Sequence, residues 1–179
     1  MRVAVSGTHR AGKSSLVEAL SARLPGYRVI DEPYASLEDE GYEFSDPPAI
    51  EDFEAQLARS LALAGELPAD ALVDRCPLDF VAYLRALDED YDVDADALRD
   101  AMAAFDLVVV VTIESPDRIA VSASEDRRLR RRVDEQIRAI VLEDGLGLGV
   151  EALEVTGSTD ARAEQVLSRA RRSRHSTPG

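Results

Sequence analysis

The sequence predicts an α/β fold, a three-layer α/β/α sandwich around a mainly parallel five-stranded sheet. The first observation is that short runs rich in β-branched residues alternate with longer amphipathic stretches along the chain. The second is an unbroken apolar run at 107–113, which is typical of a strand covered on both faces. The third is that glycine and charged residues follow the strands directly, where doubly wound sheets bind ligands.

Local patterns justify each element. Turn residues such as Pro25-Gly26 end the periodic stretches. Residues 34–48, with three aromatics and two prolines, are expected to form an irregular loop. The predicted strands are 2–6, 27–30, 71–73, 107–113 and 153–155, and the predicted helices are 13–24, 49–67, 78–87, 97–105, 133–143 and 161–171.

Length and charge narrow the class of protein. A chain of 179 residues with 45% hydrophobic content suits one core, so we expect a single domain over 1–170 and a disordered tail over 171–179. The net charge of -14 argues against nucleic acid and membranes as partners. One cysteine, Cys76, excludes an internal disulfide, and no basic-then-apolar segment opens the chain, so we expect a cytoplasmic protein.

Residues 7–14, GTHRAGKS, form a Walker A phosphate loop between a predicted strand and a predicted helix. Its two glycines permit a backbone that turns successive N–H groups inward onto an anion. Lys13 is then expected to reach the β- and γ-phosphates of ATP, and the Ser14 hydroxyl is expected to ligate Mg²⁺. The alternative is a glycine turn with an exposed lysine. The expected nucleotide contacts are Gly7, His9, Arg10, Ala11, Gly12, Lys13, Ser14 and Ser15.

Lys13 is the only lysine among the 21 basic Lys and Arg residues of the chain. A compact ammonium fits between phosphates better than a planar guanidinium, which favours a selected position. The chain also lacks asparagine, so the Asn-Lys-x-Asp motif that reads guanine cannot exist. The nucleotide is therefore expected to be ATP, and a GTPase mechanism is disfavoured.

Asp74 and Arg75 end the third predicted strand. An acidic residue at this place is expected to act on Mg²⁺ directly or through water, and the arginine to clamp a transferring phosphoryl group. The alternatives are a helix-capping carboxylate for Asp74 and an ion pair with a nearby acid for Arg75.

Five features follow one another along the chain. They are the phosphate loop, Asp31-Glu32-Pro33, the sequence DRCPLD at 74–79, an arginine cluster at 127–132 and Gly157-Ser158. This order of motifs resembles the P-loop small-molecule kinases. That group includes thymidylate kinase, the deoxynucleoside kinases and the AAA-domain proteins of the ribosylnicotinamide-kinase type. The resemblance spans residues 1–170.

The resemblance implies roles beyond the phosphate loop. Glu32 is the candidate general base or metal-organising carboxylate, with Asp31 as its competitor. Residues 115–132 are the candidate lid, and Arg128 and Arg131 are the arginines of this lid that are expected to contact the γ-phosphate. The rival interpretation of the arginine cluster is a polyanion-binding patch. Gly157 and Ser158 would pack against adenine, or form a simple capped turn.

The acceptor side is expected within 33–68. Tyr34 and Phe53 are candidates to stack on a ring, and Gln56 offers a paired donor and acceptor to a base edge. Ordinary core packing is the alternative for Phe53. The acidic loop disfavours a strongly anionic acceptor.

Two functions stay open. The first is a kinase that transfers the ATP γ-phosphate to a hydroxyl of a nucleoside-like or other small molecule. The second is an ATP-hydrolysing regulatory switch that signals to a partner. The sequence also leaves a homodimer open.

Overall fold

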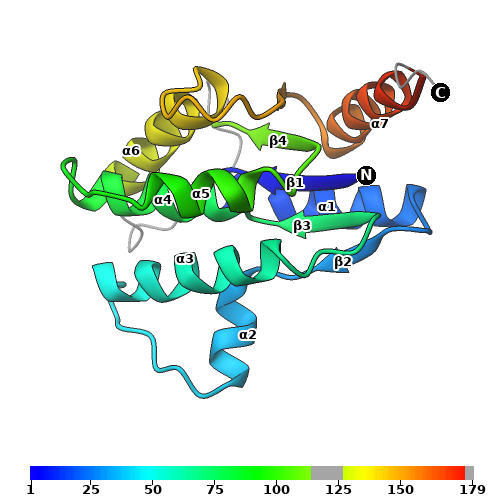
Figure 1. Ribbon diagram of the computed structural model, residues 1–179. Helices are drawn as coiled ribbons and strands as arrows, with labels where there is room; N and C mark the ends of the chain where they lie inside the picture. The colour runs from blue at the N-terminus through cyan, green and yellow to red at the C-terminus, as the bar shows by residue number, and fades with distance from the viewer. Residues whose placement is uncertain (114–126, 176–179) are drawn as a thin grey trace.

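The computed structural model describes residues 1–113 and 127–175. In that part of the chain a five-stranded sheet has the order β2-β3-β1-β4-β5 (Figure 1). All four strand pairs are parallel, which confirms the predicted fold class. The strands are β1 (Arg2–Ser6), β2 (Arg28–Ile30), β3 (Ala71–Asp74), β4 (Leu107–Val111) and β5 (Ala152–Val155).

Strand β1 lies at the centre of the sheet between β3 and β4. Val5 pairs with Asp74 of β3, and Ser6 pairs with Val110 of β4. Because parallel strands end at the same edge, this register places the residues after β1 beside those after β3. The burial of every residue of β3 and β4 agrees with strands covered on both faces.

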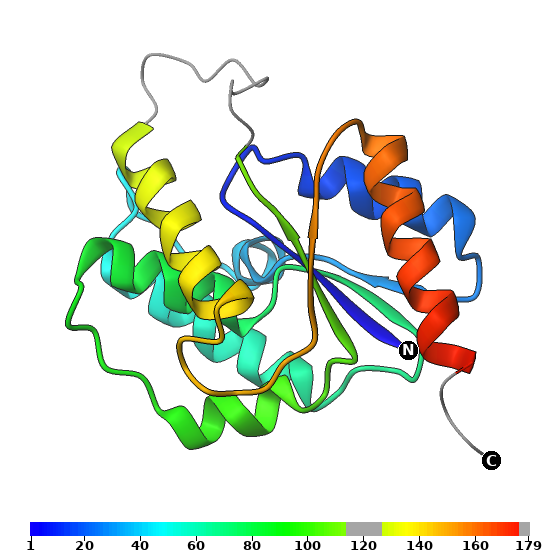
Figure 2. The ribbon, with the colours of Figure 1, turned by 90° about the horizontal axis from the view of Figure 1, so that it is seen from above.

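Helices cover both faces of the sheet (Figure 2). Helices α1 (Lys13–Arg23) and α7 (Thr159–His175) pack on one face through a core that includes Leu16 and Val166. A second core, which includes Phe80 and Ile137, lies on the other face. It is covered by α3 (Ile50–Ala64), α4 (Pro77–Leu87), α5 (Ala95–Met102), α6 (Arg127–Ile137) and the π-helix η1 (Arg138–Leu142). Among the described residues, no helix is both long and apolar enough to span a bilayer.

The prediction of an irregular loop over 34–48 is partly wrong, because helix α2 (Pro33–Asp39) occupies the first part of this segment. Pro33 stands at the first helical position after Glu32, where its missing N–H has no hydrogen bond to lose. A sequence pattern that treats proline as a turn residue misses this helix start. Figure 1 shows α2 standing apart from the sheet, below α3.

The arginine cluster lies on helix α6, which begins at Arg127 and not at the predicted residue 133. Arg130, Val133 and Ile137 are buried at helical spacing, and Arg130 takes a position that an apolar residue would normally mark. The rest of the predicted lid, 115–126, lies outside the described residues. The disordered tail predicted from residue 171 is also wrong over its first part, because α7 continues to His175.

Candidate active site

The phosphate loop, residues 7–14, adopts the unusual backbone that its glycines permit. Gly7 has a φ of 149° and Gly12 a φ of 93°. A Cβ on Gly7 would lie 2.5 Å from the carbonyl oxygen of Val111, which belongs to the neighbouring strand and cannot yield. Glycine is therefore required at position 7 both for conformation and for space.

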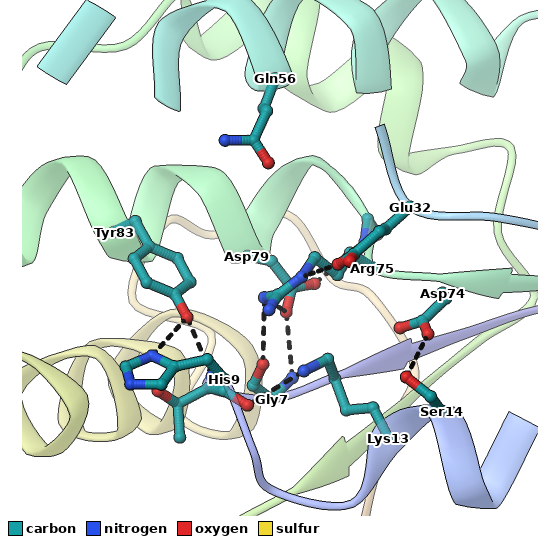
Figure 3. Close-up of polar contacts among 12 residues, drawn as sticks. Gly7, His9, Lys13, Ser14, Glu32, Gln56, Asp74, Arg75, Asp79 and Tyr83 are labelled. Atoms are coloured by element: carbon teal, nitrogen blue, oxygen red, sulfur yellow. Dashed lines mark hydrogen bonds and ion pairs between the residues drawn. The ribbon is translucent and has the colours of Figure 1, made fainter. Parts of the chain in front are cut away.

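Two amides at the start of the loop are held by helix α4. The Gly7 amide donates to Asp79 Oδ1 at 3.0 Å, and the His9 amide donates to the Tyr83 hydroxyl at 2.9 Å (Figure 3). Asp79 is fully buried, and its Oδ2 also accepts from the Cys76 amide at 2.9 Å. The carboxylate thus caps α4 and fixes the phosphate loop at the same time.

The later amides of the loop form the start of helix α1. The N–H groups of the first turn have no intrahelical acceptor. The first intrahelical hydrogen bond runs from the Leu16 amide to the Gly12 carbonyl, at 3.2 Å. The positive end of the helix points at the same place. The start of α1 therefore combines amides that lack an intrahelical acceptor with the positive end of the helix, which suits an anion, and phosphate binding here stays a prediction.

Lys13 is the first residue of α1, and its exposed fraction is only 5%. Its Nζ donates to the Thr8 carbonyl at 3.0 Å. Burial lowers the Lys13 pKa from 10.5 to about 8, the Arg75 cation adds to this effect, and the nearby carboxylates of Asp79 and Asp74 oppose it. A bound polyphosphate would place negative charge beside this buried ammonium and so stabilise its charged form.

Ser14 and Asp74, the two predicted metal ligands, are brought together. The Ser14 hydroxyl donates to Asp74 Oδ2 at 3.0 Å, while the buried Asp74 Oδ1 has no hydrogen-bond partner. Burial raises the Asp74 pKa, and Lys13 and Ser14 oppose that rise. An orphaned carboxylate oxygen beside a hydroxyl is the donor set that Mg²⁺ prefers, so these residues fit the ion.

A cavity of about 440 Å³ opens beside this pair and is also lined by Asp31. Asp31 therefore lies on the side of Ser14 and Asp74. Glu32, the next residue, turns toward Arg75 instead. The structure thus separates the two carboxylates that the sequence left in competition.

Arg75 occupies a left-handed backbone conformation, with a φ of 72°. Its Nε donates to Glu32 Oε2 at 2.8 Å, and its Nη1 donates to the Gly7 carbonyl at 3.3 Å and lies 3.7 Å from Asp79 Oδ1. The guanidinium carbon is 5.4 Å from the centre of the Tyr83 ring. The structure therefore shows the ion pair that was the alternative interpretation of Arg75. The Glu32 side chain remains 40% exposed.

The acceptor-side candidates separate into two groups. Phe53 stacks on Tyr83 with ring centres 4.7 Å apart, and Gln56 Nε2 donates to the Asp52 carbonyl at 3.0 Å. Figure 3 shows the Gln56 carboxamide pointing from α3 toward Tyr83 and Arg75. Tyr34 instead stacks on Phe44 and is 38% exposed.

One member of the arginine cluster, Arg130, contacts the phosphate loop. Its guanidinium donates hydrogen bonds to the carbonyls of His9 and Arg10. The two arginines chosen from the sequence, Arg128 and Arg131, are exposed on α6. Their contact with a γ-phosphate stays a prediction.

The turn between β5 and α7 has the backbone that its glycine permits. Gly157 has a φ of 94°, and the Ser158 hydroxyl accepts from the Ala161 amide at 3.2 Å. This is the capped turn that was the alternative interpretation. An adenine contact at Gly157 and Ser158 stays a prediction.

Residues 2–162 match the model of a family described as an AAA domain. The chain belongs to this family. No curated protein matches the sequence.

Solved kinases share the fold of this AAA domain. Deoxyadenosine kinase from M. mycoides with bound dATP is 15% identical with a TM-score of 0.68, over 96% of this chain and 100% of that chain. Thymidylate kinase from Candida albicans is 15% identical with a TM-score of 0.63, over 96% and 91%. Shikimate kinase from Aquifex aeolicus is 13% identical with a TM-score of 0.61, over 99% and 100%. At these identities the likeness shows the fold, and it confirms the resemblance to P-loop small-molecule kinases.

Sequence reasoning missed three residues of the AAA domain site. Asp79 follows the N-cap Cys76 by three positions, so the capping-box spacing was an available signal. Tyr83 lies one helical turn after Asp79 and so faces the same way. Arg162, whose Nη1 donates to the Ala11 carbonyl at 3.1 Å, comes from α7 and had no local signal.

Proposed function

We propose that this AAA domain binds ATP with Mg²⁺ and transfers the γ-phosphoryl group to a hydroxyl of a neutral or cationic nucleoside-like molecule. The bond from the γ-phosphorus to the β–γ bridging oxygen breaks, a bond to the acceptor oxygen forms, and the acceptor proton leaves. ADP and a phosphorylated acceptor are the products. The cytoplasm is the proposed location.

The observation that carries the proposal is the position of Glu32. Arg75 joins the Glu32 carboxylate to the Gly7 carbonyl, so an exposed carboxylate is fixed beside the phosphate loop. A group held there can orient a hydroxyl for attack and accept its proton late. In hydrolysis a water molecule would take the place of the acceptor hydroxyl, so the appearance of a phosphorylated acceptor is what distinguishes transfer from hydrolysis.

The remaining groups divide the work between them. Lys13 and the amides at the start of α1 would hold the phosphates. Ser14 and Asp74 would hold Mg²⁺, which neutralises charge on the phosphate oxygens when it is bound. Gln56 would contact the acceptor from α3.

Charge supports a neutral or cationic acceptor. Arg75 is engaged by Glu32 and lies 3.7 Å from Asp79, so its charge is largely compensated. The adjoining segment adds the carboxylates of Glu38, Asp39, Glu43 and Asp46, while Arg59 compensates the charge of Glu40. A phosphate on the acceptor would be repelled by this surface.

A transfer assay tests the proposal. The protein is incubated with Mg²⁺ and γ-labelled ATP against a panel of nucleosides, cationic nucleoside analogues and nucleoside monophosphates. We expect label in the product of a nucleoside-class acceptor and none in the product of a monophosphate. Slow hydrolysis with no labelled acceptor would favour the regulatory switch instead. Unchanged ATP affinity in Lys13→Ala would contradict the nucleotide site itself.

The variant Glu32→Gln tests the role of the carboxylate. Gln keeps an oxygen that can accept from Arg75, so ATP affinity should stay within about twofold, while turnover should fall by roughly a hundredfold or more. The exposed Glu89→Gln in the turn after α4 is the matched control and should change neither quantity. Equal losses of affinity and turnover would show that Glu32 is structural.

A further inference from the structure

Three consecutive carbonyls of the phosphate loop accept hydrogen bonds from two arginines. Arg130 Nε donates to the His9 carbonyl at 3.2 Å, and its Nη2 donates to the Arg10 carbonyl at 3.3 Å. Arg162 Nη1 donates to the Ala11 carbonyl at 3.1 Å. Arg130 lies on α6 and Arg162 on α7, which cover opposite faces of the sheet. In Figure 2 the loop runs between these two helices.

The peptide geometry explains why donors are needed on this side. The N–H and C=O of a trans peptide point in opposite directions, so amides that converge on an anion turn their carbonyls outward. A carbonyl that is buried without a donor destabilises the folded loop. Hydrogen bonds from a charged guanidinium are also stronger than neutral ones, so two arginines can hold the loop firmly.

The surroundings of both side chains suit this role. Arg130 is 4% exposed, although it belongs to a cluster whose neighbours Arg128 and Arg131 are exposed. The Arg162 guanidinium passes close to Gly12, where a Cβ would lie 3.0 Å from its Nη1. The second glycine of the loop therefore also leaves room for the arginine.

We propose that Arg130 and Arg162 are positioning residues, which hold the outer carbonyls of the phosphate loop and so preorganise its amides for the β-phosphate. The inference rests on the proposed nucleotide binding and adds a role that a phosphate-contacting arginine does not have. An arginine that contacts the γ-phosphate strengthens ATP binding and leaves ADP binding unchanged. A positioning arginine strengthens the binding of ATP, ADP and inorganic pyrophosphate by the same factor.

The experiment measures the affinity for these three ligands by calorimetry in Arg130→Met and Arg162→Met. Methionine keeps the length of the aliphatic stem and removes the donors. We expect each variant to lose about tenfold in affinity for all three ligands, with an unchanged ATP-to-ADP ratio. Arg130→Lys, which puts a single ammonium nitrogen where two guanidinium nitrogens each reach a carbonyl, should recover part of the loss. Arg169→Met, two turns along α7 and paired with Glu151, is the control and should bind as wild type.

Other outcomes separate the possible failures. A loss confined to ATP would overturn the positioning role and show a γ-phosphate contact. Unchanged affinity in both variants would show that the carbonyl bonds do not organise the loop. Arg162 is partly exposed, so Arg162→Met decides the question even where the buried Arg130→Met does not fold. A wild-type protein that binds none of the three ligands would overturn the proposed function along with this inference.

Discussion

Replacing Lys13 with methionine should stabilise the nucleotide-free protein while it removes nucleotide binding. Lys13 is almost completely buried, and burial together with the Arg75 cation lowers its pKa from 10.5 to about 8. At pH 7 the folded protein must keep this ammonium charged in a place that disfavours the charge. The charged Lys13 therefore lowers the free energy of unfolding of the nucleotide-free protein, and a bound polyphosphate would offset this loss.

The size of that cost follows from the two pKa values. A pKa lowered from 10.5 to about 8 makes the charged form roughly 3 kcal/mol less favourable in the folded state at pH 7. The hydrogen bond from Nζ to the Thr8 carbonyl offsets about 1 kcal/mol of what Lys13→Met gains. We expect the variant to be more stable than wild type by about 1–2 kcal/mol at pH 7.

The sign of the pH dependence is fixed by linkage. Between about 8 and 10.5 the unfolded chain binds the Lys13 proton and the folded protein does not. The wild-type contribution from this group therefore becomes less unfavourable as the pH rises through that window, and by pH 9.5 less than half of the cost remains. The advantage of Lys13→Met should then shrink to near zero.

Urea unfolding at pH 7 and pH 9.5, without nucleotide or Mg²⁺, measures both quantities. The difference between variant and wild type at each pH cancels the other titrating groups. Arg28→Met, which removes an exposed cation that stays charged throughout, should show no change between the two pH values. The reasoning is refuted if Lys13→Met is no more stable than wild type at pH 7, or if its advantage is the same at pH 9.5.

Two further predictions concern the metal pair and the loop glycine. Asp74→Asn should remove most of the increase in ATP affinity that Mg²⁺ gives, because the orphaned carboxylate oxygen beside Ser14 loses its charge. Titration of ATP with and without Mg²⁺ measures this increase. An unchanged effect of Mg²⁺ on ATP affinity would contradict the prediction. Gly7→Ala should destabilise the fold by about 1–3 kcal/mol or more in urea unfolding, because its Cβ would meet the Val111 carbonyl oxygen at 2.5 Å. Gly26→Ala, with nothing within 4 Å of the added Cβ, is its control, and equal effects of the two changes would count against the steric argument.

The sequence located the strand ends because that prediction needs only local patterns and one rule of topology. Residues after β1, β2, β3 and β5 meet at one edge of the sheet once the strands are parallel. The spacing of Gly7 and Gly12 likewise states the loop conformation directly. The pairing of Ser14 with Asp74 follows from these facts, since the register places the ends of β1 and β3 side by side.

The sequence could not choose among the arginines, because the choice depends on which face of α6 is buried. Arg130 occupies a core position of that helix, a place where sequence patterns look for an apolar residue. Arg162 is 151 residues away from Ala11 along the chain, and only the packing of α7 against α1 brings it near the loop. The same limit applies to Glu32 against Asp31, because adjacent side chains at a strand end point to different sides.

The position of Glu32 depends on the residues that hold the phosphate loop. Asp79 accepts from the Gly7 amide and lies 3.7 Å from Arg75 Nη1, and Arg75 in turn bonds both the Gly7 carbonyl and Glu32. The loop, the guanidinium and the carboxylate therefore form one connected unit, with Tyr83 stacked beneath the guanidinium. In such a unit Arg75 need not touch a phosphate to matter for transfer. By fixing the distance between the phosphate loop and Glu32, it would set where an acceptor hydroxyl meets the γ-phosphate, which is the positioning that phosphoryl transfer requires most.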